Sequence, residues 1–201
     1  VEHKERIKEI SKNVDVLTLT ATPIPRTLQM SLLGIRNLSQ LQTPPSSRMP
    51  IQTYVTEYNP HLAKEVICRE LSRGGQVFYL YNLVSTIFQK AEQIKKAIPN
   101  ARVGVVHAKM DSEDIDKIMT EFYLGNIDVL VCTSIVESGL DVPNANTILI
   151  ENSDKFGLSQ LYQIKGRVGR SNRVAYSYLF YNKNKELTPE AEKRLKAIKE
   201  F

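Results

Sequence analysis

The sequence lacks the features that mark membrane-spanning, secreted and metal-binding chains. No uninterrupted apolar run approaches the roughly 20 residues that a membrane helix requires, and residues 1–8 alternate in charge where a signal peptide would be apolar. The two cysteines, Cys68 and Cys132, stand in apolar surroundings without the CxxC or Cys/His spacing of a metal site. We predict that both are buried, reduced thiols in a cytoplasmic protein, and we expect no metal ligands.

Composition limits the chain to ordinary globular classes. The chain is 42% hydrophobic and 24% charged, a composition that excludes a disordered tail, a coiled coil and a collagen-like polymer. Its 201 residues suffice for one domain, or for one domain and part of another. The net charge of +5 arises in residues 161–201, which hold ten basic and four acidic side chains. This local positive field suits a phosphate, although Lys193, Lys196 and Lys199 alone fit a solvated helix equally well.

From residue 51 onward, strand and helix patterns alternate. We expect strands at 51–58, 76–82, 102–107, 129–133, 147–151 and 175–181, and helices at 61–73, 86–98, 112–124 and 158–165. A final helix should begin with Thr188 as its N-cap and Pro189 at its first position. The alternation predicts an α/β fold, a largely parallel sheet with helices on both faces, whose functional loops follow the strands.

Before residue 51 the pattern differs. Residues 14–20 are typical of a short β-branched strand, and the prolines of 21–27 end it and can start a helix. Residues 43–50 are rich in proline and serine and have no periodicity, which favours a linker.

The segment from Gln160 to Arg170 carries the clearest chemical signal. Arg167 and Arg170 are three residues apart, a helical spacing that would place them on one face, and Gly166 and Gly169 let the backbone approach a ligand. The planar, permanently charged guanidinium matches phosphate oxygens, so the pair can neutralise charge that develops on a γ-phosphate during transfer. A helix C-terminus, where glycine and arginine are common, is the alternative.

Three further segments carry candidate residues. After the strand at 129–133, Thr133 and Ser134 can meet a nucleic-acid phosphate, and Gly139 and Asp141 can then face a nucleotide; a strand ending in a helix cap is the alternative. The threonines of 18–27 can bond across a cleft, or this segment is only a proline-capped helix start. His107 follows a strand, and a lone histidine is more often structural than catalytic.

Together and in this order, these segments resemble the C-terminal half of a superfamily 2 helicase or translocase motor. The resemblance links the Thr-Ala-Thr-Pro element at 20–23 to motif III, 77–82 to motif IV, 133–141 to motif V and 163–170 to motif VI. The wording of 2–8, 15–27 and 156–161 is similar to the bacterial transcription-repair coupling factors. The resemblance covers essentially the whole chain, and its motif III and VI wording is shared with the RecG branch-migration helicases.

The resemblance implies a domain plan and an activity. Residues 1–45 would be a helix-strand-helix remnant of motor lobe one, 46–185 a RecA-like second lobe, and 186–201 the start of a translocation helical hairpin. The parent protein would move on double-stranded DNA using ATP, displace stalled RNA polymerase and recruit the excision-repair machinery.

The resemblance also assigns roles to single residues. Arg167 and Arg170 would reach ATP and Mg²⁺ bound mainly by the first lobe, and the same cleft would contain Gly139, Asp141 and Gln163. The DNA groove would be lined by Asn82, His107, Thr133 and Ser134. Thr20 and Thr22 would couple the two sites.

Two patterns of such motors are missing. The chain has no G-x-x-x-x-G-K-[ST] phosphate loop and no Asp-Glu-x-x box, which supply the lysine and carboxylates that hold Mg²⁺·ATP. We therefore expect a fragment that does not hydrolyse ATP alone. A RecG-type lobe and a non-catalytic module that binds DNA or a protein are the alternatives.

Overall fold

The computed structural model describes residues 39, 50–133, 142–182 and 186–200. Residues 41–201 form one compact unit, and the fold below is that of this unit. The strand expected at 14–20 lies outside the described residues. So do five candidate residues, namely Thr20, Thr22, Ser134, Gly139 and Asp141.

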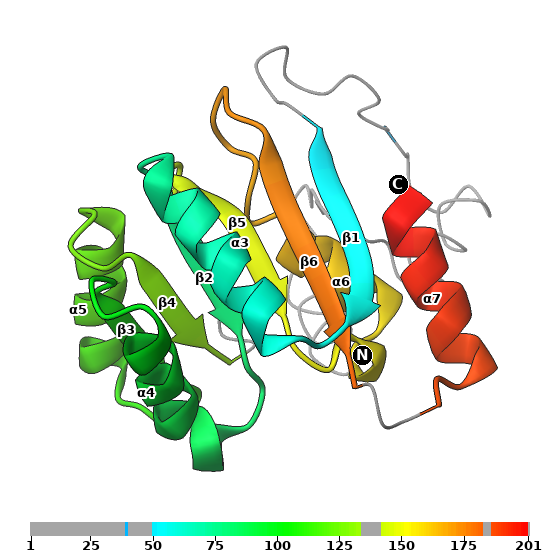
Figure 1. Cartoon of the computed structure of the whole chain (residues 1–201), viewed down its shortest axis with the longest axis horizontal. Coiled ribbons are helices and arrows are strands. Elements are labelled where there is room, and N and C mark those ends of the chain that lie inside the picture. The colour runs from blue at the N-terminus through cyan, green and yellow to red at the C-terminus, as the bar shows by residue number, and fades with distance from the viewer. Residues whose placement is uncertain (1–38, 40–49, 134–141, 183–185, 201) are drawn as a thin grey trace, which may run out of the picture. The chain divides into compact units, whose positions relative to one another are not determined.

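Six strands form one sheet in the order β1-β6-β5-β2-β4-β3 (Figure 1). They are β1 (Ile51–Glu57), β2 (Gln76–Leu80), β3 (Val103–Val106), β4 (Val129–Cys132), β5 (Ala145–Ile150) and β6 (Ala175–Tyr181). Every neighbouring pair is parallel, which confirms the predicted sheet. Each strand therefore enters from one edge of the sheet, the amino edge, and leaves at the opposite one, the carboxyl edge.

Helices cover both faces of the sheet. One face carries α3 (Pro60–Ser72) and α4 (Ile87–Ala97), and the other carries α5 (Ser112–Tyr123), α6 (Leu158–Lys165) and α7 (Pro189–Glu200). Two short 3-10 turns, η1 (Val84–Thr86) and η3 (Ser153–Lys155), follow β2 and β5. The hydroxyl of Thr188 accepts a hydrogen bond from the Ala191 amide at 3.2 Å, as expected of the predicted N-cap.

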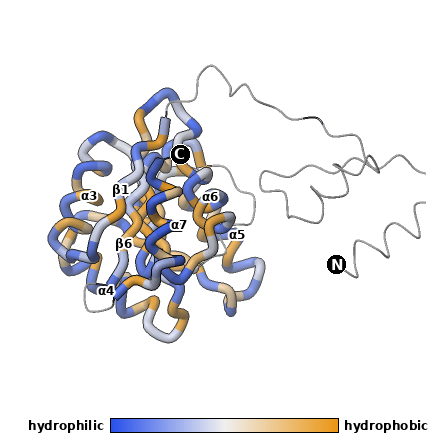
Figure 2. Tube along the Cα trace, turned by 90° about the vertical axis from the view of Figure 1, so that its right-hand side faces the viewer, coloured by the Kyte–Doolittle hydropathy of each residue, from blue (hydrophilic) through white to orange (hydrophobic). Residues whose placement is uncertain are grey.

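Each face of the sheet has its own apolar core. In β2, Phe78 and Leu80 pack toward α5, α6 and α7, whereas Val77 and Tyr79 pack toward α3 and α4. All five residues of β2 are buried, as the central strand of a two-sided parallel sheet must be. Hydrophobic segments lie mostly inside the unit and hydrophilic ones on its helices and loops (Figure 2).

A charged pair is enclosed in the core on the α3–α4 face. Lys90 Nζ lies 2.7 Å from Glu151 Oε1, and these side chains are 11% and 9% exposed. The Tyr79 hydroxyl donates to the same carboxylate, and the ammonium lies 4.9 Å and 5.1 Å from the ring centres of Tyr58 and Tyr81. Burial lowers the pKa of Lys90, but the hydrogen bond and charge of Glu151 outweigh it and leave this pKa raised. The ammonium therefore stays charged at neutral pH.

The prediction that both cysteines are buried is wrong for Cys68. Cys132 lies inside β4, where burial raises the pKa of its thiol, but Cys68 is exposed on α3. The inward side of α3 includes Val66, Ile67 and Glu70. Because successive helical residues are about 100° apart, Cys68 turns away from that side.

Removing the partner of the buried ammonium should destabilise the unit. Glu151→Gln leaves Lys90 charged and largely enclosed, so we expect a loss of about 3 kcal/mol in the free energy of unfolding, measured with urea at neutral pH. The control, Glu92→Gln, removes the partner of Lys95 from an exposed pair 2.8 Å apart and should leave the midpoint unchanged. Equal effects of the two changes would contradict the enclosed pair.

The two thiols should differ in reactivity. In the native chain at mildly alkaline pH, an aromatic disulfide reagent should titrate Cys68 rapidly and Cys132 only after guanidinium unfolding, because only the first thiol is accessible. The absorbance of the released thiolate measures both reactions. Two thiols reacting at one rate in the native chain would show that the burial of Cys132 is wrong.

Candidate functional site

Three of the candidate nucleic-acid residues lie at the carboxyl edge of the sheet. Leu80, Cys132 and Val106 are register partners across β2, β4 and β3, so the residues that follow them are neighbours. Adjacent strands are roughly 4.8 Å apart, which puts the residues that follow β2 and β3 about 10 Å from each other. The structure thus brings the loops that carry Asn82, Thr133 and His107 together.

These three residues differ in exposure. Asn82 is exposed, His107 is half-buried and Thr133 is 2% exposed. His107 Nδ1 accepts a hydrogen bond from the Lys109 amide at 3.3 Å, so a neutral ring carries its proton on Nε2. Contact between the Thr133 hydroxyl and a phosphate stays a prediction, because this side chain is enclosed at the end of β4.

The two arginines lie in a turn after α6. This helix begins where the Gly157 amide donates to Gln160 Oε1 at 3.0 Å, and it ends at Lys165. The prediction that Arg167 and Arg170 share a helix face is therefore wrong. Gly169 between them has a φ of +76°, a left-handed conformation that ends the helical path.

Neither arginine of this turn is buried. Arg167 is half-buried and Arg170 is exposed, as is Gln163 on α6. Arg170 Nε donates to the Gly166 carbonyl at 3.3 Å, which satisfies a carbonyl at the helix C-terminus. The sequence alternative, in which an arginine caps the helix C-terminus, therefore holds for Nε of Arg170. The Arg170 side chain is nevertheless exposed at the surface.

The arginine turn lies at the amino edge, across the sheet from Asn82 and His107. A Cβ atom on Gly169 would lie 3.0 Å from Ile51 Cγ1 and 3.3 Å from the Cβ atom of Ala175, the first residues of β1 and β6. Seven residues of β6 at about 3.3 Å each span roughly 20 Å. Among the described residues, the arginine turn and the candidate nucleic-acid residues are therefore separate, and packing against β1 explains the glycine without a ligand.

Hydrogen bonds join the arginine turn to the loop before β2 and to the start of β5. Arg73 Nη2 donates to the Val174 carbonyl and Arg173 Nη1 donates to the Arg73 carbonyl, both at 2.9 Å. The Ser171 hydroxyl donates to Asn146 Oδ1 at 2.7 Å. These bonds fix the turn to the amino edge.

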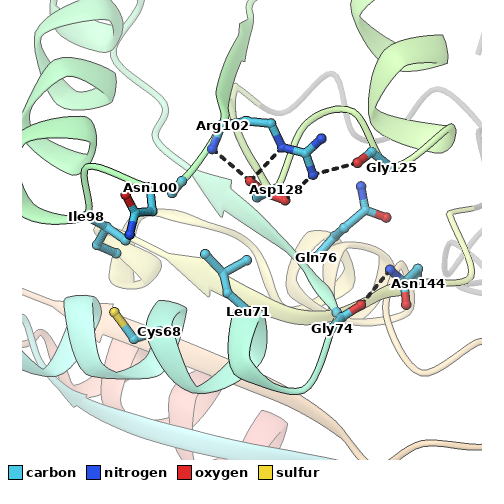
Figure 3. Close-up of a pocket in the computed structure, with 12 residues that line it drawn as sticks. Cys68, Leu71, Gly74, Gln76, Ile98, Asn100, Arg102, Gly125, Asp128 and Asn144 are labelled. Atoms are coloured by element: carbon cyan, nitrogen blue, oxygen red, sulfur yellow. Dashed lines mark hydrogen bonds and ion pairs between the residues drawn. The ribbon is translucent and has the colours of Figure 1, made fainter.

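A hollow of about 470 Å³ opens at the same edge (Figure 3). Its lining includes Cys68, Gln76, Asn100, Arg102, Asp128 and Asn144. The Arg102 guanidinium binds both oxygens of Asp128, at 2.6 Å and 3.0 Å, and the Gly125 carbonyl at 2.8 Å. Burial raises the pKa of Asp128, but its bonds to Arg102 lower it further, so the pair stays ionised.

Sequence reasoning missed the enclosed pair and the hollow. Lys90 has a sequence signal, because it interrupts the apolar positions Ile87, Ala91 and Ile94 on the inward side of α4. A lysine there needs a buried partner. The hollow has no comparable signal, because its walls come from four separate segments of the chain.

The described part of the chain contains neither a helix long and apolar enough to cross a membrane nor a cluster of three histidine, cysteine or acidic side chains that would hold a metal ion.

Curated relatives that match the whole chain include two bacterial proteins. Over 201 residues it is 59% identical to the transcription-repair-coupling factor of Bacillus subtilis (strain 168) and 58% identical to that of Staphylococcus haemolyticus (strain JCSC1435). The chain spans 17% of the length of each.

Solved structures that share the fold include RecG and Dbp5. RecG bound to a three-way DNA junction matches with a TM-score of 0.77 and 35% identity, covering 92% of this chain and 25% of RecG. Saccharomyces cerevisiae Dbp5 bound to RNA and ADP BeF3 matches with a TM-score of 0.68 over 99% of this chain and 52% of Dbp5, and its 16% identity supports the fold alone.

The family model for the helicase conserved C-terminal domain matches residues 60–172, which include four of the six strands of the sheet, β2 to β5, whereas β1 and β6 lie outside the match. That stretch runs from α3 through the arginine turn and holds both candidate sites. The chain belongs to the helicase conserved C-terminal domain family.

Proposed function

We propose that this chain is the second motor lobe of an ATP-dependent double-stranded DNA translocase of the transcription-repair coupling type. The observation that carries this proposal is the 58–59% identity to transcription-repair-coupling factors along the entire chain. Residues 46–185 are the lobe, 1–45 belong to lobe one, and 186–201 begin the helical hairpin. In the cytoplasm of a bacterium, such a motor displaces stalled RNA polymerase and recruits the excision-repair machinery.

In this proposal the arginine turn completes a nucleotide pocket. ATP bound by a first lobe supplies the phosphoanhydride bond whose hydrolysis drives movement. Arg167 and Arg170 fit its γ-phosphate, because neither is buried and each guanidinium offers a planar fork of donors. Gly139, Asp141 and Gln163 belong to the same cleft. Mg²⁺ accompanies the ATP in this proposal and is bound mainly by the first lobe.

The carboxyl edge is the DNA side of the lobe. Asn82, His107, Thr133 and Ser134 lie along the groove of a duplex, and their amide, imidazole and hydroxyl groups suit phosphate and sugar contacts. The residues that flank segment 134–141 support a link between the two sites. Thr133 directly follows β4 at the carboxyl edge, and the Val142 carbonyl accepts a hydrogen bond from the amide of Ala145, the first residue of β5, at the amino edge. Thr20 and Thr22 couple the lobes.

A RecG-type branch-migration lobe is the second candidate. The 35% identity to RecG and the TM-score of 0.77 favour it over other helicase classes. The higher identity to the coupling factors favours the first proposal. A module that binds DNA or a protein without catalysis differs from both, because it would restore no ATP hydrolysis when a first lobe is supplied.

A chimera tests the motor assignment. This chain should replace the corresponding 17% of the Bacillus subtilis coupling factor, and DNA-stimulated ATP hydrolysis should be measured by phosphate release. We expect the chimera to be active, and Arg167→Ala or Arg170→Ala each to lower its rate by about 10³-fold or more. The chain alone should be inactive, with or without DNA.

Arg173→Ala is the matched control, because it removes the same charge from the same turn and only a bond to the Arg73 carbonyl. It should keep most of the activity. If Arg167→Ala and Arg170→Ala hydrolyse ATP as well as the parent chimera, the assignment of these arginines is wrong. An inactive parent chimera that is folded would favour the non-catalytic module.

Duplex binding by the isolated chain should be weak and strongly dependent on salt. One lobe that makes about four phosphate contacts should lose roughly 100-fold in affinity between about 50 and 200 mM salt. The reason is that binding releases counterions from the DNA, and their release is less favourable into a more concentrated salt solution. Fluorescence anisotropy of a labelled duplex measures this slope. An affinity independent of salt would contradict a phosphate-contacting groove.

A further inference from the structure

Two large apolar side chains are exposed on one short segment beside the candidate nucleic-acid residues. Leu83 is 46% exposed and Phe88 is 58% exposed. They flank η1, and five residues at no more than about 2 Å of rise each keep their backbones within about 10 Å. Asn82 directly precedes Leu83, and the ring of Phe88 meets that of His107 edge-on, with centroids 5.6 Å apart. Leu83 and Phe88, the apolar pair, thus lie between two candidate DNA-binding residues, Asn82 and His107.

From this arrangement we propose that Phe88 and Leu83 insert into the minor groove of the duplex bound at the carboxyl edge and partly unstack a base step. The inference rests on the proposed function, and it names a contact that the helicase motifs do not contain. Proteins that bind the minor groove use apolar wedges of this kind beside asparagine and lysine side chains.

The core does not account for the pair. Ile87, Ala91 and Ile94 fill the inward side of α4 at 0%, 2% and 7% exposure, and Phe88 is rotated about 100° from Ile87. An outward phenylalanine therefore leaves most of its ring in water and forgoes the stabilisation that burial would give.

Side-chain contacts with the ends of β2 and β5 fix the segment that carries the apolar pair. Lys90, two residues after Phe88, is bound to Glu151 at the end of β5, and the Thr86 and Tyr81 hydroxyls are 2.8 Å apart. These contacts fix the first turn of α4 to β2 and β5. A wedge on such a segment meets DNA without a large loss of conformational freedom.

The polar groups around the pair favour DNA as its partner. Asn82 offers an amide, His107 an Nε2–H donor and Lys109 an exposed cation, which suit base edges and phosphates. On the other side of this loop, Glu113 and Asp114 begin α5 and repel phosphate. The duplex therefore runs over the α4 side of the edge, where the apolar pair lies.

The test uses the full 201-residue chain and duplexes with 2-aminopurine at a central step, at low salt. The fluorescence of this base rises when it unstacks. We expect the wild-type chain to raise it most at flexible pyrimidine–purine steps, and Phe88→Ala to abolish the rise and weaken affinity about tenfold. Leu83→Ala should have the same effect in weaker form, and Phe88→Leu should keep part of both signals.

Leu124→Ala is the matched control, because Leu124 is 62% exposed and lies at the end of α5, away from the carboxyl edge. It should bind DNA like the wild type. Urea unfolding of each variant checks its stability, and if Phe88→Ala does not fold, Phe88→Gln takes its place.

The outcomes separate the two proposals. If the wild-type chain does not bind duplexes, the DNA side of the proposed function fails. If it binds and Phe88→Ala binds equally with the same fluorescence, the wedge is overturned while the proposed function stands. Unchanged DNA binding together with a loss of self-association in light scattering would instead assign the pair to contacts between two copies of the chain.

Discussion

The burial of the central strands on both faces fixes the geometry on which the rest of the molecule depends. Side chains alternate along each strand between two apolar cores, so a slip of one residue would exchange the two sets of side chains. In β2 that slip would move Phe78 into the space of Tyr79, whose hydroxyl binds Glu151. The register is thus specified, and with it the alignment of the strand ends that carry the candidate residues.

Charge inside this core reinforces the alignment. The Lys90–Glu151 pair joins α4 to the end of β5, and Tyr79 connects the pair to β2. A buried ion pair contributes little net stability compared with apolar packing, but it tolerates few alternative arrangements, because either charge alone would be enclosed without a partner. We infer that the pair specifies where α4 begins relative to the sheet.

Much of this fold was predictable because its strands are short apolar runs separated by amphipathic helices. The bounds of β6 and α6 were predicted correctly. By contrast, β5 begins at Ala145, two residues before the predicted start, because Ala145 already pairs with Gln76 of β2, and the buried Asn146 accepts a hydrogen bond from Ser171. In the sequence alone, a polar residue at the start of a strand resembles a loop residue.

The site was less predictable, since spacing alone does not say where a helix ends. Arg167 and Arg170 have helical spacing, yet Gly169 between them takes a left-handed conformation beside Ile51. That contact joins segments more than 100 residues apart, and no local pattern reveals it. The positions of Asn82 and His107 were easier to predict, because parallel strands bring the residues that follow them to one edge of the sheet.

The contact between Gly169 and Ile51 has a mechanical consequence. Ile51 is where the chain enters the sheet, so the arginine turn sits beside the entry point, and the far ends of the strands are roughly 20 Å away. When a rigid body rotates, each atom moves in proportion to its distance from the axis. If the lobe of the proposed motor turned about the point where its chain enters the sheet, the guanidinium groups would therefore move little, whereas Asn82 and His107, which follow the far ends of the strands, would move much farther.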